Sequence, residues 1–178
     1  MEKFWIFKMN YEGLKYFKKL QRIYEDKLKD KLLKDPYIKE NLPKLIKAIQ
    51  KTREAFIKNE SFAFCKKCAE SGEKCCEAGL EWKLSPAEFF LNLLILDYLN
   101  ESFDLFNLDR PEDCLFLGEN GCLLKLAPLF CRNFFCDKLS NFLGKKRLIE
   151  IQHAMEDEAI LSFKLSNYLN QKYLFNLK

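Results

Sequence analysis

Eight cysteines are the residues of this chain whose type and spacing best suit chemistry. The first group is Cys65, Cys68, Cys75 and Cys76, and the second group is Cys114, Cys122, Cys131 and Cys136. The flanking segments 1–64 and 137–178 contain no cysteine. Thiols that merely filled a hydrophobic core would not leave both flanks empty, so their clustering predicts a set of metal ligands.

In the first group, Cys65 and Cys68 form a C-x-x-C step, the spacing at which a turn lets two sulfurs converge on one metal. Cys75 and Cys76 follow after six residues. Side chains of adjacent residues diverge in both helix and strand, so these two cysteines are expected to do different jobs. One of them would ligate with Cys65 and Cys68, while the other turns toward the second group or serves a second metal.

The second group is less typical of zinc, because its intervals of seven, eight and four residues contain no paired C-x-x-C knuckles. Apolar residues interleave with these cysteines: Phe116, Leu117, Leu123, Leu124, Leu126, Phe130, Phe134 and Phe135. Such residues either keep water away from an iron–sulfur cluster and tune its potential, or belong to the ordinary core. The sequence leaves both interpretations open.

The net charge of +4 counts each cysteine as neutral, whereas metal ligands are thiolates. Four thiolates around Zn²⁺ or a [4Fe–4S]²⁺ core carry a net charge of about −2, so two such sites would cancel the excess. The basic residues are concentrated in segment 1–64, which has 16 Lys and Arg against 9 Asp and Glu. We expect this segment to present a solvated basic face; a protein partner is the alternative, and nucleic acid is not favoured.

The chain of 178 residues, 48% of them hydrophobic, is expected to form one domain with a sizeable core. Segment 1–64 is predicted to be a basic helical hairpin, 65–136 the cysteine-cluster core, and 137–178 a C-terminal helical segment. An export signal and a membrane span are not recognisable in the sequence. The cysteines are therefore expected to lie in a reducing, cytoplasmic environment.

The hydrophobic periodicity predicts a mainly α fold in which helices clamp a central cysteine-rich segment of loops and short helices. An amphipathic helix is expected over 10–33, then a short helix from Pro36 that Pro43 separates from a longer one, and a terminal helix over about 145–173. Ser85 to Glu88 predicts a capping box at the start of a buried helix that ends near Asn100. Segment 107–121 is expected to be irregular, with a tight turn between Cys114 and Cys122 and one short hairpin around Glu119-Asn120-Gly121.

Other catalytic patterns are weakly supported. His153 is the only histidine, and its spacing from Glu150 matches one half of a di-iron motif, but a surface role is expected. A nucleophilic serine elbow, a phosphate-binding glycine loop and a dinucleotide fingerprint are not found in the sequence. A reactive cysteine beside Arg132 or Lys74 is a further hypothesis, because a nearby cation acidifies a thiol.

Four motifs occur in a fixed order between Cys65 and Cys136, over 72 of the 178 residues. They are Cys65-x-x-Cys68 with Cys75-Cys76, Leu84-Ser85-Pro86-Ala87-Glu88, Cys114-Leu115-Phe116-Leu117 with Gly121-Cys122, and Pro128-Leu129-Phe130-Cys131-Arg132-Asn133-Phe134. This order resembles the YkgJ-like cysteine-cluster family, also known by its CxxCxxCC motif, and the resemblance implies chelation of zinc or iron.

The chain departs from the pattern of that family at three places. Six residues separate Cys68 from Cys75 where the family commonly has about two residues, Ala127 stands where the family often has Arg, and Cys136 is an addition. A related segment occurs in flagellin lysine N-methylases, where the resemblance implies an iron–sulfur cluster.

The leading hypothesis is a metalloprotein whose eight cysteines bind iron–sulfur, most simply [4Fe–4S], for electron transfer or cluster-dependent chemistry. The second is a structural zinc protein whose basic helical region binds an acidic partner or RNA. The third is an iron–sulfur-dependent enzyme similar to the lysine N-methylases. The sequence does not decide whether the protein is an enzyme.

Overall fold

The computed structural model describes residues 2–73, 75–119 and 121–175, and for residues 2–10 it describes the backbone without the side chains. The elements in chain order are α1 (Glu2–Ile23), the π-helical turn η1 (Tyr24–Leu28), α2 (Lys29–Lys34), α3 (Pro36–Lys58), α4 (Ser61–Glu70), the 3-10 turn η2 (Leu80–Lys83), α5 (Pro86–Leu99), β1 (Leu117–Gly118), β2 (Gly121–Cys122), α6 (Leu129–Asn133), α7 (Asp137–Leu169) and the π-helical turn η3 (Asn170–Leu174). The predicted mainly α class is confirmed. Among the described helices, none is both long and apolar enough to cross a membrane.

Helix α5 is the centre of the main hydrophobic core. The predicted capping box is present: Glu88 N donates to Ser85 Oγ over 3.2 Å, and Ser85 N donates to Glu88 Oε2 over 3.0 Å. Residues 89–96 are all buried, as expected of a helix that is apolar on every side. The helix ends at Asn100, which has a left-handed conformation (φ 53°), close to the predicted end.

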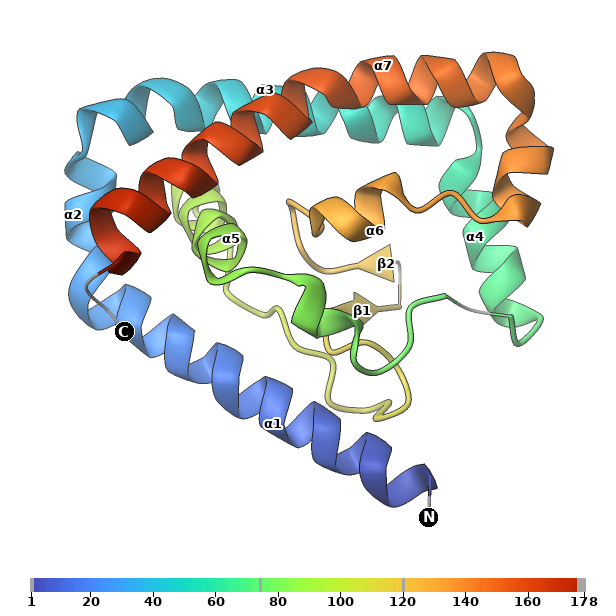
Figure 1. The fold of residues 1–178 in the computed structure, drawn as a ribbon, viewed down its shortest axis with the longest axis horizontal. Helices are drawn as coiled ribbons and strands as arrows, with labels where there is room; N and C mark the ends of the chain where they lie inside the picture. Colours follow the sequence, from blue (N-terminus) through green and yellow to red (C-terminus); the bar gives the residue numbers. More distant parts are fainter. Residues whose placement is uncertain (1, 74, 120, 176–178) are drawn as a thin grey trace.

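Helix α1 packs against α5 through aromatic side chains (Figure 1). The Phe17 ring is fully buried, with its centroid 5.1 Å from Phe89 and 5.0 Å from Phe116. Near the other end of α5, Asp97 accepts hydrogen bonds from the Tyr24 hydroxyl at 2.5 Å and from Lys29 Nζ at 2.6 Å. The N-terminal helix is thereby held to the core at both ends of the contact.

Helices α3 and α7 lie side by side along the opposite edge of the molecule (Figure 1). The buried Thr52 hydroxyl donates to the Ala154 carbonyl over 3.3 Å. On the exposed edges, Lys51 pairs with Asp157 at 3.1 Å and Lys58 with Glu150 at 2.5 Å. These ion pairs add little energy, so the helix pair is held mainly by its buried apolar face.

Two sequence expectations about the helices are wrong. Because α1 packs against α5 while α3 packs against α7, segment 1–64 is not a closed helical hairpin. Pro43 also does not divide its segment: α3 runs through it, because Leu42, Leu45 and Ile46 on either side are buried in the core and packing outweighs the lost hydrogen bond.

The terminal helix predicted over about 145–173 is confirmed by the part of α7 that follows Gly144, together with η3. Helix α7 begins at Asp137 and changes direction at Gly144, whose φ of +64° favours glycine. Its first turns join a second, smaller apolar cluster, which is separate from the core around α5. The members are Ala55, Leu139, Leu143, Ile151, Ala154 and Met155, with Phe56, Phe64, Phe135, Cys136, Phe142 and Leu148 packed against them.

Candidate metal centre

The structure divides the eight cysteines into two sets of four. The first thiol set is Cys65, Cys68, Cys75 and Cys136, and the second thiol set is Cys76, Cys114, Cys122 and Cys131. This division differs from the grouping along the chain, because Cys76 joins the later cysteines and Cys136 joins the earlier ones. The adjacent residues Cys75 and Cys76 therefore differ in their other thiol neighbours, although they also lie within electrostatic range of each other.

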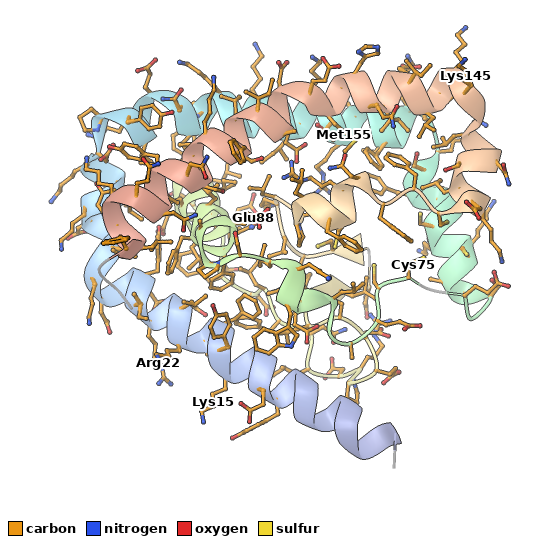
Figure 2. The ribbon with its side chains drawn as sticks, viewed as in Figure 1. Lys15, Arg22, Cys75, Glu88, Lys145 and Met155 are labelled. Carbon is orange, nitrogen blue, oxygen red and sulfur yellow. The ribbon has the colours of Figure 1, made fainter. Side chains whose placement is uncertain are left out.

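Three separate segments form the first thiol set. Cys65 and Cys68 lie on α4, three residues apart and so on one face of the helix, rather than in the turn that their spacing suggested. Cys75 comes from the loop after α4 (Figure 2), and Cys136 is the N-cap residue of α7, where its Sγ accepts from Leu139 N over 3.5 Å. The Cys75 and Cys136 thiols are hydrogen-bonded to each other, and Cys65 lies within electrostatic range of both.

Contacts between α4 and α7 hold the first thiol set together. Cys68 Sγ donates to the Glu73 carbonyl over 3.3 Å, which folds the loop back on α4, and the Glu73 carboxylate pairs with Lys138 of α7. On the apolar side, the Phe64 and Phe142 rings stack with centroids 4.5 Å apart. The first thiol set thus lies at the edge of the smaller apolar cluster.

The second thiol set is assembled by backbone pairing next to the main core. Cys114 N donates to the Cys76 carbonyl over 3.0 Å, and Glu77 forms an antiparallel bridge with Asp113. The hairpin of β1 and β2 then places Cys122 opposite Leu117. This short hairpin was predicted, although Asn120 at its turn lies outside the described residues.

Helix α5 fixes the segment that connects β2 to Cys131 on α6. The buried Asn92 side chain accepts from Leu126 N and donates to the Leu126 carbonyl, both over 2.9 Å. Cys76 is the thiol that Cys114, Cys122 and Cys131 have in common as an electrostatic neighbour. Cys76 also lies within range of Cys65, as expected of the residue that links the two sets.

The thiols of each set lie near one another, but they do not form a complete coordination site for an ion. Among the described residues, no three or more His, Cys, Asp or Glu side chains are already arranged to hold a single metal ion. The donor chemistry nevertheless suits a thiophilic metal, since each set supplies the four thiolates that a zinc ion or a cubane cluster takes.

Burial raises the pKa of six of the thiols above its ordinary value: Cys65, Cys75, Cys76, Cys114, Cys122 and Cys131. Burial raises the pKa of Cys65 and Cys131 to about 11, and the pKa of Cys114 and Cys122 to about 12. For Cys131, repulsion from Cys76 and Glu88 adds to burial and outweighs the attraction of Arg132. The hypothesis of an acidified nucleophile beside Arg132 is therefore wrong, and Lys74 lies outside the described residues.

The apolar residues of the cysteine region divide between core and surface. Phe116, Leu124 and Leu126 are fully buried, and Leu117, Leu123 and Phe135 are half-buried. By contrast, Phe130 and Phe134 are exposed and stack on each other at 6.0 Å. Phe116, Leu124 and Leu126 therefore belong to the ordinary core, and that they also shield an iron–sulfur cluster stays a prediction.

A buried ion pair beside Cys131 was not predicted from the sequence. Arg132 Nη1 donates to Glu158 Oε1 over 2.9 Å and Arg132 Nη2 donates to Ser162 Oγ over 3.2 Å. Glu158 and Ser162 lie on the same inward stripe of α7 as Met155 and Leu165. Two polar residues on an otherwise apolar stripe were the signal that could have revealed a buried partner for an arginine.

His153 lies on the exposed face of α7, where its Nδ1 is 3.0 Å from Glu156 Oε1. The expected surface position of His153 is confirmed.

Comparison of the chain with protein-family models, with curated proteins and with solved structures finds no match in any of the three. The resemblance to the cysteine-cluster family stays a prediction that rests on the four motifs alone.

Proposed function

We propose that this protein is an electron-transfer protein that binds two [4Fe–4S] clusters, one at each thiol set. The observation that carries the proposal is the division of eight cysteines into two sets of four. Four cysteine thiolates are the ligand complement of one such cluster. The first cluster would be held by Cys65, Cys68, Cys75 and Cys136, and the second by Cys76, Cys114, Cys122 and Cys131.

The surroundings of both sets support a redox cluster. Stacked Phe64 and Phe142 flank the first set, and buried Phe116 and Leu124 flank the second. Apolar neighbours limit the access of water to a cluster and tune its reduction potential. Four protein ligands leave each cluster without an open iron position, which favours electron transfer over binding of a substrate to the metal.

A cluster at each set would supply one-electron redox chemistry, and the chain itself supplies the ligands, their spacing and their shielding. Because cysteine binds metal as a thiolate, thiols of each set would release protons when metal binds. Because Cys75 and Cys76 are adjacent in the chain and would bind different clusters, the two proposed sites would be close to each other.

Anaerobic purification followed by a visible spectrum and metal analysis of the same sample tests the proposal. We expect a brown protein with broad absorption near about 400 nm and about eight iron and eight sulfide per chain. Addition of dithionite should bleach this absorption. Zinc at about two per chain, with no colour after reconstitution with iron and sulfide, would contradict the proposal and assign the same ligands to structural zinc.

A further inference from the structure

A basic groove runs along the exposed side of α1. The groove has a volume of about 650 Å³, and its lining includes Tyr11, Lys15, Lys18, Lys19, Arg22 and Trp82. Figure 2 shows Lys15 and Arg22 projecting from α1 away from the helical core. Tyr11, Lys15, Lys18 and Arg22 follow the spacing of one helical stripe, so their side chains lie in a row about 16 Å long.

The cations of the groove are available to a ligand. Within the described part of the chain, none of its four cations takes part in an ion pair, and Glu12 is the one carboxylate among the lining residues. Elsewhere on the surface, lysines such as Lys51 and Lys58 are paired with carboxylates. The groove therefore keeps an uncompensated positive charge that attracts an anionic partner.

Tertiary structure adds an aromatic face to this basic helix. Trp82 comes from η2 and lies against Tyr16, with ring centroids 5.4 Å apart, yet it remains 46% exposed. Tyr11, at 63%, is more exposed still. Gly13 permits this approach, since a Cβ at that position would lie 3.2 Å from Glu81 Cγ on η2. Aromatic side chains left open beside free cations offer a flat apolar surface on which a partner can stack.

We infer that this groove binds single-stranded nucleic acid, with the cations on the phosphates and Trp82 and Tyr11 stacked on bases. A charged track beside aromatic platforms is the arrangement that sequence-tolerant single-strand binding uses. An acidic peptide would contact the cations but would not stack on the aromatic rings. The bases of a duplex are stacked on each other, so their faces are not available to Trp82 and Tyr11. The inference does not depend on which metal the thiol sets hold.

The affinity of the full-length, metal-loaded protein for a labelled 15-nucleotide oligothymidylate tests this inference by fluorescence anisotropy. Binding should weaken with salt, with a log–log slope of about −2 to −3 if three or four phosphates are contacted. The triple variant Lys15→Ala, Lys18→Ala, Arg22→Ala should lower the magnitude of this slope by about 2. The matched control Lys27→Ala, Lys31→Ala, Lys34→Ala removes the same charge from exposed positions outside the groove and should leave the slope unchanged.

The aromatic contribution is tested separately. Trp82→Ala should weaken binding at least about fivefold, and Trp82→Phe should restore part of it. Because Trp82 packs against Tyr16, Tyr11→Ala provides a second variant at a more exposed position, with circular dichroism as the control for folding.

Three results would overturn the inference. The first is the absence of oligonucleotide binding at about 50 mM salt, where charge contacts are strong. The second is an equal loss of affinity in the groove variant and the control variant. The third is a tighter binding of polyglutamate than of the oligonucleotide that neither Trp82→Ala nor Tyr11→Ala affects. The last result would assign the groove to an acidic protein.

Discussion

Cys75 and Cys76 are adjacent in the chain but belong to different thiol sets, and this makes the proposed division testable at single residues. Cys75 is hydrogen-bonded to Cys136, whereas the Cys76 carbonyl accepts from Cys114 N. We expect Cys65→Ser and Cys136→Ser each to lower iron content to about half, because either change removes a ligand of the same cluster.

Combined variants separate the two sets. Cys65→Ser with Cys136→Ser should lose no more iron than either change alone, whereas Cys65→Ser with Cys122→Ser should lose nearly all of it. Iron and sulfide analysis after anaerobic reconstitution gives the measurement. If the cysteines were instead divided by their order in the sequence, Cys136 would share a cluster with Cys122. Cys65→Ser with Cys136→Ser would then lose nearly all of the iron, and Cys136→Ser with Cys122→Ser would lose no more than either change alone.

The Arg132–Glu158 pair is a second feature at the scale of single residues. Both side chains are almost fully buried, at 7% and 3% exposure. Glu158→Ala leaves a buried guanidinium without its carboxylate, and we expect it to lower the free energy of unfolding by about 3–5 kcal/mol. Chemical denaturation measures this loss.

The double variant Arg132→Met with Glu158→Leu removes both charges and should cost much less than Glu158→Ala alone, since no unpaired charge remains. If the single and double variants were equally unstable, packing rather than charge burial would account for the loss.

At the scale of elements, Asp35 joins the start of α3 to the end of the chain. Its carboxylate accepts from the backbone N of Tyr37 and of Ile38 as the N-cap, and from Tyr168, Lys172 and Tyr173. Burial alone would raise the pKa of Asp35, but the hydrogen bonds from Lys172 and its other partners outweigh burial and hold the pKa well below its ordinary value.

This depressed pKa predicts a pH dependence with a definite sign. The carboxylate stabilises the fold above its unfolded pKa of about 3.9, and that contribution is lost as pH falls through the lower folded value. Asp35→Asn keeps an N-cap side chain but removes the charge, so the difference in melting temperature between parent and variant should shrink below about pH 4. A difference that stayed constant down to pH 2 would exclude this titration. If the thiol sets hold metal as proposed, acid would remove it from both proteins alike, so the comparison cancels that effect.

At the scale of the whole molecule, the two thiol sets lie beside two separate apolar clusters. The core around α5 contains residues such as Phe17, Phe89 and Phe116, and the smaller cluster joins α3 to the start of α7. If the thiol sets hold metal as proposed, its removal should leave most of the helices folded, because the two apolar clusters do not depend on it, while the cysteine loops lose order.

Amide hydrogen exchange of the metal-loaded and the chelator-treated protein measures this effect. We expect protection to fall in segments 71–80 and 107–128 and to change little in α5 and in the α3–α7 pair. Loss of protection throughout the chain would instead mean that folding of the whole domain depends on the metal.

The sequence by itself determined the local features, because these depend on neighbours in the chain. The Ser85–Glu88 capping box, the buried helix that follows it, the hairpin before Cys122 and the mainly α class were all predicted correctly. The eight cysteines were recognised in the sequence as candidate ligands, and different neighbours for Cys75 and Cys76 were expected because adjacent side chains diverge in any regular backbone; that these residues bind metal stays a prediction.

Only the tertiary structure decided which cysteines meet. Cys136 reaches the first thiol set because α7 folds back along α3 and brings its N-cap to α4, a long-range contact with no local signal. The same reason applies to the continuous helix through Pro43, where packing overrides local preference, and to Trp82, which joins the basic face of α1 from η2. Which residues meet across long separations in the sequence depends on the whole fold. Hydrophobic spacing therefore identified the helices but not the helices against which they pack.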